Sequence, residues 1–312
     1  MNRPPLTIGL VNGMPGEAQR QTEHQFRGIL AAASNDTVRL KTFSPGSSFN
    51  ADADIESLAA AGLDGLIVTG MPPRANKLVD EPFWPRLTAL TDFVLDHAMP
   101  TVWSCLAAHA VVLYLDGIER RRLPLKLSGL MECTRTDLEH PIARDLPERW
   151  RMPHSRYNDV PEDVLRSGGY QILSRSDRGG ADIFAKEFGT GVPFVFCQGH
   201  PEYDADTLLR EYRRDVRHYL SGTNDAYPEP PDGVFGTDSS AQLAAFRERA
   251  VNARSIETLA AFPWTACATG LSHSWRDLTI TLYSNWLTQI ADHRPRIVCP
   301  RPDEGARDAA CS

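Results

Sequence analysis

The sequence predicts an α/β protein with a mainly parallel sheet flanked by helices, a small strand-rich insertion and a helical C-terminal extension. Apolar strand-like runs alternate with helix-like segments through the first two thirds of the chain, as in parallel sheets whose strands are joined by helices. Three of the strand-like runs end in segments that contain Gly and Pro, at residues 12–15, 69–73 and 198–201. Sites in such sheets gather at the carboxyl ends of the strands, so we expect these segments to share one edge.

The alternation is clearest in the first hundred residues. Residues 7–11 read as a first strand and residues 18–33 as a first helix, while 63–70 is a second apolar strand. Between 84 and 97 the apolar residues recur at helical spacing. The strand that begins at Thr101 then runs directly into a further helix.

Between residues 126 and 188 the pattern changes to shorter, partly alternating runs. Asp177-Arg178-Gly179-Gly180 predicts a hairpin turn, because Gly pairs favour such turns. We expect three short strands here, over residues 127–132, 169–174 and 181–186.

The last third begins with an apolar strand over residues 192–197, followed by a helix over 205–220. Pro, Gly and Asp dominate residues 222–236, and two further helices are expected over 240–262 and 274–291. The division that follows is an α/β domain (1–221), a linker or loop (222–240), a helical extension that packs on the same domain (241–293) and a disordered tail (294–312).

Composition narrows the class of protein. The chain has 312 residues and a net charge of −7 with no basic stripe, which argues against a nucleic-acid binder. No window approaches the roughly 20 apolar residues of a membrane span, and the N-terminus lacks the apolar core of a signal peptide. Six cysteines at irregular spacing fit reduced thiols, so we expect a cytoplasmic protein. No cluster of His, Cys, Asp and Glu has metal-site spacing, and no metal is predicted.

The chemistry-bearing residues stand at two of the expected strand ends. His200 and Glu202 are two residues apart, so in an extended backbone their side chains point the same way and the carboxylate orients the imidazole. Cys105 lies where a strand turns into a helix, and the positive end of the helix dipole favours a thiolate there. Cys, His and Glu in this order suggest nucleophilic acyl chemistry.

Five segments carry a resemblance to a known family. The sequence resembles the homoserine O-acyltransferases of methionine biosynthesis, which use succinyl-CoA or acetyl-CoA and belong to the class I glutamine amidotransferase-like fold. The similarity runs from about residue 7 to 220 and resumes at 284–287. The segments are Asn12-Gly13-Met14-Pro15, residues 64–70, Lys126-Leu127-Ser128-Gly129, residues 153–157 and, most specific, Gly199-His200-Pro201-Glu202-Tyr203-Asp204.

The resemblance implies a mechanism. Cys105 accepts the acyl group from acyl-CoA as a thioester, His200 is the general base, and Glu202 orients it. A ping-pong scheme follows, with acyl-CoA as co-substrate and no other cofactor, and the family suggests a homodimer. By position, Lys126, Ser155 and Arg214 contact the small hydroxy amino acid, which is homoserine or serine.

The acyl group depends on the loop after residue 70. In the family, one position there is Gly with succinyl donors and Glu with acetyl donors, but here it is Arg74. A cation pairs with a succinyl carboxylate, which favours succinyl-CoA, although its bulk could also shorten the pocket. Pro73 has no N–H, so the expected oxyanion donors are the amides of Arg74 and Leu106.

Other interpretations stay open. A glutamine amidotransferase or hydrolase would have the same fold, although Ser104 and Leu106 replace the glycines that usually flank an amidotransferase cysteine. A non-catalytic binding protein is a third class. We interpret His109 as a helix-face residue and His154 as support for the loop of Ser155. We interpret the other cysteines as structural or tail thiols; they are Cys133, Cys197, Cys267, Cys299 and Cys311. We interpret Arg120-Arg121-Arg122 as a solvated turn that CoA phosphates could also use.

Overall fold

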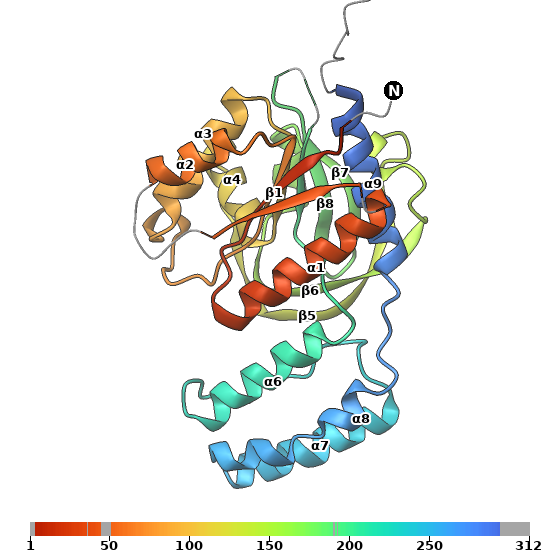
Figure 1. Ribbon diagram of the computed structural model, residues 1–312. Coiled ribbons are helices and arrows are strands. Elements are labelled where there is room, and N and C mark those ends of the chain that lie inside the picture. Colours follow the sequence, from red (N-terminus) through yellow and green to blue (C-terminus); the bar gives the residue numbers. More distant parts are fainter. Residues whose placement is uncertain (1–3, 36, 45–50, 190, 192, 294–312) are drawn as a thin grey trace, which may run out of the picture.

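A nine-stranded sheet forms the centre of the computed structural model, which describes residues 4–35, 37–44, 51–189, 191 and 193–293 (Figure 1). The strands lie in the order β2-β1-β3-β4-β9-β8-β7-β5-β6, and the first five are parallel. The parallel strands are β1 (Thr7–Val11), β2 (Arg39–Phe43), β3 (Gly65–Val68), β4 (Thr101–Ser104) and β9 (Phe194–Cys197).

The remaining strands continue the same sheet in antiparallel pairing. The expected hairpin at 177–180 is confirmed, since Ser176 pairs with Gly180 across the turn. One long strand was not predicted, because its polar and Pro-containing sequence hides the period of two. That strand is β6, and the set comprises β5 (Arg121–Arg135), β6 (Arg149–Asp159), β7 (Gln171–Ser176) and β8 (Gly180–Lys186).

Helices cover both faces of the sheet because alternate residues of its buried strands point to opposite sides. In β9, Val195 packs into the core beneath helices α1 and α9, whereas Phe194 and Phe196 pack beneath α3 and α4. The helices of these two layers are α1 (Gly16–Ser34), α2 (Ala51–Ala60), α3 (Trp84–Asp96), α4 (Leu106–Asp116), α5 (Glu162–Ser167) and α9 (Arg276–His293), with short 3-10 turns η1 (Leu78–Asp80) and η2 (Pro141–Ala143).

A third core lies at one end of the molecule, where α6, α7 and α8 gather (Figure 1). Tyr212, Phe246 and Phe262 pack there, so α6 joins the sheet to the C-terminal helices. The expectation of one helix over 240–262 is wrong in its second half. The Ser255 side chain caps a new turn by accepting from the amide of Glu257. The elements are α6 (Thr207–Leu220), α7 (Thr237–Asn252), η3 (Ile256–Ala261) and α8 (Trp264–Ala268).

Helix α9 returns to the sheet and packs on α1, with the rings of Phe26 and Tyr283 edge to face at 6.2 Å. The division of the chain at residues 221, 240 and 293 stays a prediction, and the tail at 294–312 lies outside the described residues. Among the residues described, no helix has both the length and the apolar character needed to cross a membrane.

Candidate active site

Cys105 occupies a strained turn between β4 and α4. Its backbone has φ 51° and ψ −111°, a left-handed conformation that L-residues other than Gly rarely adopt. The turn is held by two hydrogen bonds: the Cys105 amide donates to the carbonyl of Cys197 in β9 (2.7 Å), and the His109 amide donates to the Cys105 carbonyl (3.2 Å). The thiol remains partly exposed at this turn. A nucleophile on a sharp strand-to-helix turn is presented clear of its own backbone.

His200 and Glu202 are paired, with Nδ1 2.9 Å from Oε1. The pairing does not arise from an extended backbone as expected, because β9 ends at Cys197 and the chain then turns, with the Tyr203 amide donating to the His200 carbonyl (3.2 Å). A tight turn brings the two side chains together instead. The His200 amide donates to the carbonyl of Pro153 (2.8 Å), which fixes the turn on β6.

The His200 imidazole is buried among groups that stabilise its protonated form. Burial alone would lower the pKa of His200, but the electrostatic interactions with Cys105 and with Glu202, whose Oε1 lies 2.9 Å from Nδ1, outweigh it and raise this pKa well above its usual value. Tyr203 stacks on the imidazole with ring centroids 4.2 Å apart. Cys105, His200 and Glu202 therefore form an interacting triad. Cys105 comes from the end of β4, and His200 and Glu202 both come from the turn after β9.

Lys126 and Arg214 come from distant elements and meet at one carboxylate, Asp215. Lys126 Nζ lies 2.7 Å from Asp215 Oδ2, and an Arg214 guanidinium nitrogen lies 2.9 Å from Oδ1. Burial would raise the pKa of Asp215, but the two cations outweigh it and hold this pKa below its usual range. Sequence reasoning missed Asp215; the only local signal was its place beside Arg214 on an amphipathic helix.

A second chain of contacts links the base to the same region. The Tyr203 hydroxyl donates to Glu211 Oε1 (2.9 Å), and Glu211 lies 3.9 Å from the Arg214 guanidinium. Ser155 is half-buried on β6 and pairs with Ser128 of β5, two residues along the strand from Lys126. The structure thus brings Lys126, Arg214 and the base into one neighbourhood.

The loop after β3 differs from expectation. The amides of Arg74 and Ala75 both donate to the buried carboxylate of Glu81, at 2.9–3.0 Å and 2.9 Å. The Arg74 amide is therefore already bonded and does not face the nucleophile as an oxyanion donor. The loop residue beside the Leu106 amide is Gly70, where an added Cβ would lie 3.3 Å from the Leu106 nitrogen.

Arg120 also differs from the expected solvated turn. It is half-buried, and although burial lowers its pKa, Glu81 and Cys105 act on the guanidinium in the opposite direction. Arg120 therefore lies near Glu81 and Cys105 and not in a solvated turn. Sequence reasoning could not separate it from the exposed Arg121 and Arg122 beside it, because only the fold turns one of the three inward.

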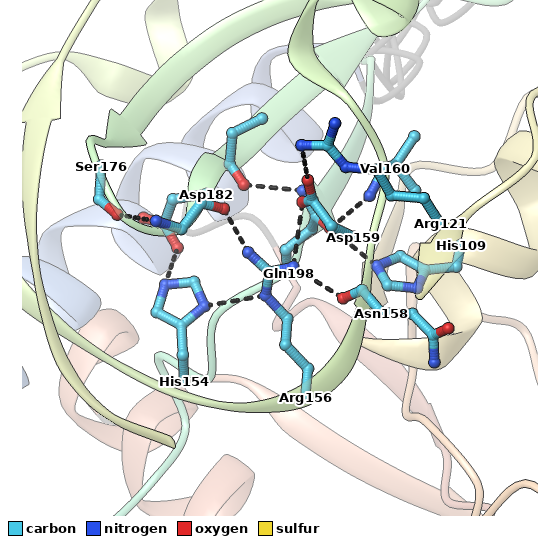
Figure 2. A network of polar contacts seen from close by, with 12 residues as sticks. His109, Arg121, His154, Arg156, Asn158, Asp159, Val160, Ser176, Asp182 and Gln198 are labelled. Carbon is cyan, nitrogen blue, oxygen red and sulfur yellow. Dashed lines mark hydrogen bonds and ion pairs between the residues drawn. The ribbon is translucent and has the colours of Figure 1, made fainter. Parts of the chain in front are cut away.

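A buried polar network supports the segment that leads to the base (Figure 2). The Gln198 side-chain oxygen accepts from His109 Nε2 (2.8 Å) and from the Val160 amide (3.1 Å), while its Nε2 donates to the Ala181 carbonyl (2.7 Å). Burial, aided by the charge of Arg156, lowers the pKa of His109 to about 3. His109 is thus a neutral, buried donor on the inward face of α4.

The other half of the network holds β6 and the β7–β8 hairpin together. Arg156 Nε donates to His154 Nδ1 (3.3 Å), and His154 Nε2 lies 3.3 Å from Asp182 Oδ1 (Figure 2). Arg156 also donates to Asp159 Oδ1 (3.0 Å) and to the Gly179 carbonyl. His154 therefore supports the segment of Ser155, which is part of strand β6 and not the expected loop, from a fully buried position.

Cys133, His154 and Asp182 form a buried triplet whose potential ligand atoms lie within 4.8 Å of one another. Sequence spacing did not show it, because the three residues come from different strands. His154 Nδ1 already accepts a hydrogen bond from Arg156, and His154 Nε2 lies 3.3 Å from Asp182 Oδ1. Burial, aided by the Asp182 charge, raises the pKa of Cys133, so its thiol stays protonated. This donor set fits a polar core network better than a metal site.

Comparison with known proteins identifies the family. The family model described as homoserine O-succinyltransferase matches residues 2–296. The chain belongs to the homoserine O-succinyltransferase family. Relatives with that name include a protein of Methylorubrum extorquens, 43% identical, with 92% of this chain and 88% of the relative covered. A protein of Bradyrhizobium japonicum is also 43% identical, with 92% and 90% covered.

Membership of the homoserine O-succinyltransferase family makes the chain an acyltransferase. Solved structures extend the likeness to the fold alone. A glutamine amidotransferase of Methylobacillus flagellatus has a TM-score of 0.53 at 14% identity, covering 92% of this chain and 96% of that one. A glutamine amidotransferase of Thermotoga maritima has a TM-score of 0.52 at 12% identity, covering 93% and 100%. The predicted fold class is confirmed.

Proposed function

We propose that this protein transfers an acyl group, with succinyl favoured, from acyl-CoA to the hydroxyl of L-homoserine in methionine biosynthesis. The observation that carries the proposal is the triad of Cys105, His200 and Glu202, with Cys105 on a strained turn, its charge acting on the His200 imidazole, and that imidazole hydrogen-bonded to Glu202. The names of the relatives in the family support homoserine and succinyl as the two substrate groups.

The first half of the proposed reaction loads the enzyme. His200 takes the proton of the Cys105 thiol, and the sulfur attacks the thioester carbonyl of acyl-CoA. The Leu106 amide, the first of helix α4, donates to the oxyanion that develops. When the intermediate collapses, the carbon–sulfur bond to CoA breaks, and the leaving sulfur takes the proton from His200. The acyl group is then a thioester on Cys105.

The second half moves the acyl group to the acceptor. His200, held by Glu202, takes the hydroxyl proton of homoserine while the oxygen attacks the thioester. Collapse breaks the bond to Cys105, whose sulfur takes the proton back. Arg214 and Lys126, both held by Asp215, lie where they would bind the acceptor carboxylate, and Ser155 would contact its polar groups.

Mass spectrometry tests the covalent step. The protein is incubated with succinyl-CoA alone, with acetyl-CoA alone, and with each donor followed by homoserine. We expect a labile adduct on Cys105 that homoserine removes, and no adduct on Cys105→Ala. Because Cys197 is fully buried, Cys197→Ala is the matched control and should still be acylated. Wild-type protein left unmodified by both donors would contradict the mechanism.

Serine is the alternative acceptor, and glutamine hydrolysis is the alternative reaction on this fold. A matrix of both donors against homoserine and serine separates the acceptors, and release of ammonia from glutamine without any use of CoA would favour the hydrolase. A cytoplasmic location and a homodimer complete the proposal; size-exclusion chromatography with light scattering checks the latter.

A further inference from the structure

A cleft rich in arginine lies beside the candidate active site. It has a volume of about 680 Å³ and is lined by α1, α6 and the segment from η3 to Trp264. Four arginines of α6 line it, against two glutamates, Glu17 and Glu211. This is a cationic site in a chain whose net charge is −7. The arginines are Arg210, Arg213, Arg214 and Arg217.

Two of these arginines have no acidic partner within the part of the chain that the structure describes. Arg210 is paired with Asp206 (2.7 Å) and Arg214 with Asp215 (2.9 Å), but Arg213 and Arg217 form no ion pair there. Residues four apart lie on the same side of a helix, so their guanidinium groups are neighbours. Two unpaired cations on one cleft wall are the arrangement that a bound dianion would neutralise.

The cleft also extends to a residue that contacts the base. Tyr203, which stacks on the His200 imidazole, is one of its lining residues. Helix α6 rises about 15 Å from Thr207 to Arg217 at ~1.5 Å per residue. The cleft therefore offers a path that begins beside the base and ends at the arginine pair, with the length expected of a site for an extended donor.

We propose that Arg213 and Arg217 bind the phosphate groups of the acyl-CoA donor. The inference rests on the function proposed above, which requires a CoA thioester. The guanidinium fork matches phosphate oxygens, and Trp264 and Phe262 add an apolar part to the lining of the same cleft, against which the adenine base can lie. The C-terminal helices thus complete a donor site that the sheet domain lacks on its own.

A ping-pong order explains why the cleft also contains Arg214, which we assign to the acceptor. CoA leaves after the cysteine has been acylated, so donor and acceptor occupy neighbouring or overlapping positions at different times. The phosphate-binding pair lies before and after Arg214 on the helix, at positions 213 and 217. Binding of one substrate therefore competes with binding of the other, and free CoA should compete with homoserine.

The test compares two donors that differ only in the distal group. Succinyl-CoA carries the phosphates, whereas the succinyl thioester of N-acetylcysteamine has none. The double variant Arg213→Gln with Arg217→Gln should lower kcat/KM for succinyl-CoA by about 10–100-fold and leave kcat/KM for the short thioester unchanged, since each charged hydrogen bond contributes roughly one factor of ten. Arg249→Gln with Arg276→Gln is the matched control, because it removes two exposed helix charges that do not line the cleft.

Binding provides a second readout. Calorimetric titration with CoA, and with adenosine 3′,5′-bisphosphate, should show binding to wild type and to the control, and at least tenfold weaker binding to the double variant. If kcat/KM of the double variant fell equally with both donors, or fell with neither, the phosphate site would be overturned while the proposed function stayed intact. Wild-type protein that uses neither thioester would instead contradict the proposed function.

Discussion

The Nε2 atom of His109 lies 2.8 Å from the side-chain oxygen of Gln198, so the helix after the nucleophile is tied to the segment that leads to the base. The bond joins two fully enclosed groups, and its donor is a neutral imidazole because burial lowers the pKa of His109 to about 3. Distances between the nucleophile and the base therefore depend on a residue pair that takes no part in the chemistry.

This pair predicts a pH dependence of stability. In the unfolded chain His109 titrates near 6.5, so between pH 6.5 and about 3 the unfolded state binds a proton that the folded state excludes, and stability falls as the pH is lowered. From pH 7 to pH 5 the loss due to His109 is about 2 kcal/mol. His109→Gln cannot titrate but still has a donor for Gln198. Urea unfolding at both pH values should show wild type losing about 2 kcal/mol more than the variant; a pH-independent difference between them would rule this out.

Glu202→Gln should slow the reaction and change its pH profile. Removing the carboxylate charge lowers the pKa of His200, because Glu202 is one of the groups that raise it. In the acylated enzyme, the acid limb of kcat should therefore move to lower pH, while kcat itself falls by about 10²–10⁴-fold as the imidazole loses its orientation. Glu56→Gln, an exposed control on α2, should keep the wild-type profile. An unshifted acid limb would argue that Glu202 does not act on the base.

Asp215→Asn should affect the acceptor and not the donor. The carboxylate holds Lys126 at 2.7 Å and Arg214 at 2.9 Å, and without its charge the two cations are no longer fixed together. We expect KM for homoserine to rise about tenfold, while the amount of acyl-enzyme formed from succinyl-CoA alone stays the same. Asp238→Asn, on an exposed part of α7, is the control. A reduced acyl-enzyme yield would place Asp215 in the donor step instead.

Arg74 should influence the choice of acyl donor. Its amide is bonded to Glu81, and its side chain lines a second cleft, of about 890 Å³, beside the loop after β3. Substitution therefore changes the lining of that cleft without removing a backbone contact. We expect Arg74→Gly to keep succinyl-CoA as the better donor and Arg74→Glu to lower kcat/KM for succinyl-CoA about tenfold through repulsion of its carboxylate. Both donors should be assayed with each variant. Equal effects on the two donors would show that Arg74 does not discriminate between them.

Gly199→Ala should disturb the base segment through packing. A Cβ at this position would lie 2.5 Å from Asp182 Oδ1, 2.7 Å from Met152 Cγ and 3.0 Å from His154 Nε2. We expect a loss of about 1–3 kcal/mol of unfolding free energy together with reduced activity, because His200 follows directly. Gly28→Ala is the matched control: an added Cβ on α1 meets nothing within 4 Å, and the change should stabilise the helix by up to about 1 kcal/mol. Equal effects of both variants on unfolding would contradict the packing account.

Local patterns in the sequence were enough for the fold class and for several of the buried strands and helices. The apolar runs ending at Val68, Ser104 and Cys197 are buried strands, and the helical spacing from Trp84 onward predicted α3 almost to the residue. The site motif was equally local: Cys105 stands at its strand-to-helix turn, and His200 and Glu202 do pair. The cause of the pairing between His200 and Glu202 differs from the expectation, because a tight turn and not an extended backbone brings the two side chains together.

What the sequence by itself determined was therefore most of the central strands and helices and the chemistry placed at their ends, since periodicity, turn residues and short motifs depend on neighbours along the chain. Only the tertiary structure decided which groups meet. The contacts of Lys126 with Asp215 and of His109 with Gln198 each join residues 89 positions apart. Glu81 accepts a hydrogen bond from the Arg74 amide, which was expected to face the nucleophile. Such contacts follow from how helices and strands pack against one another, and no local pattern encodes that packing.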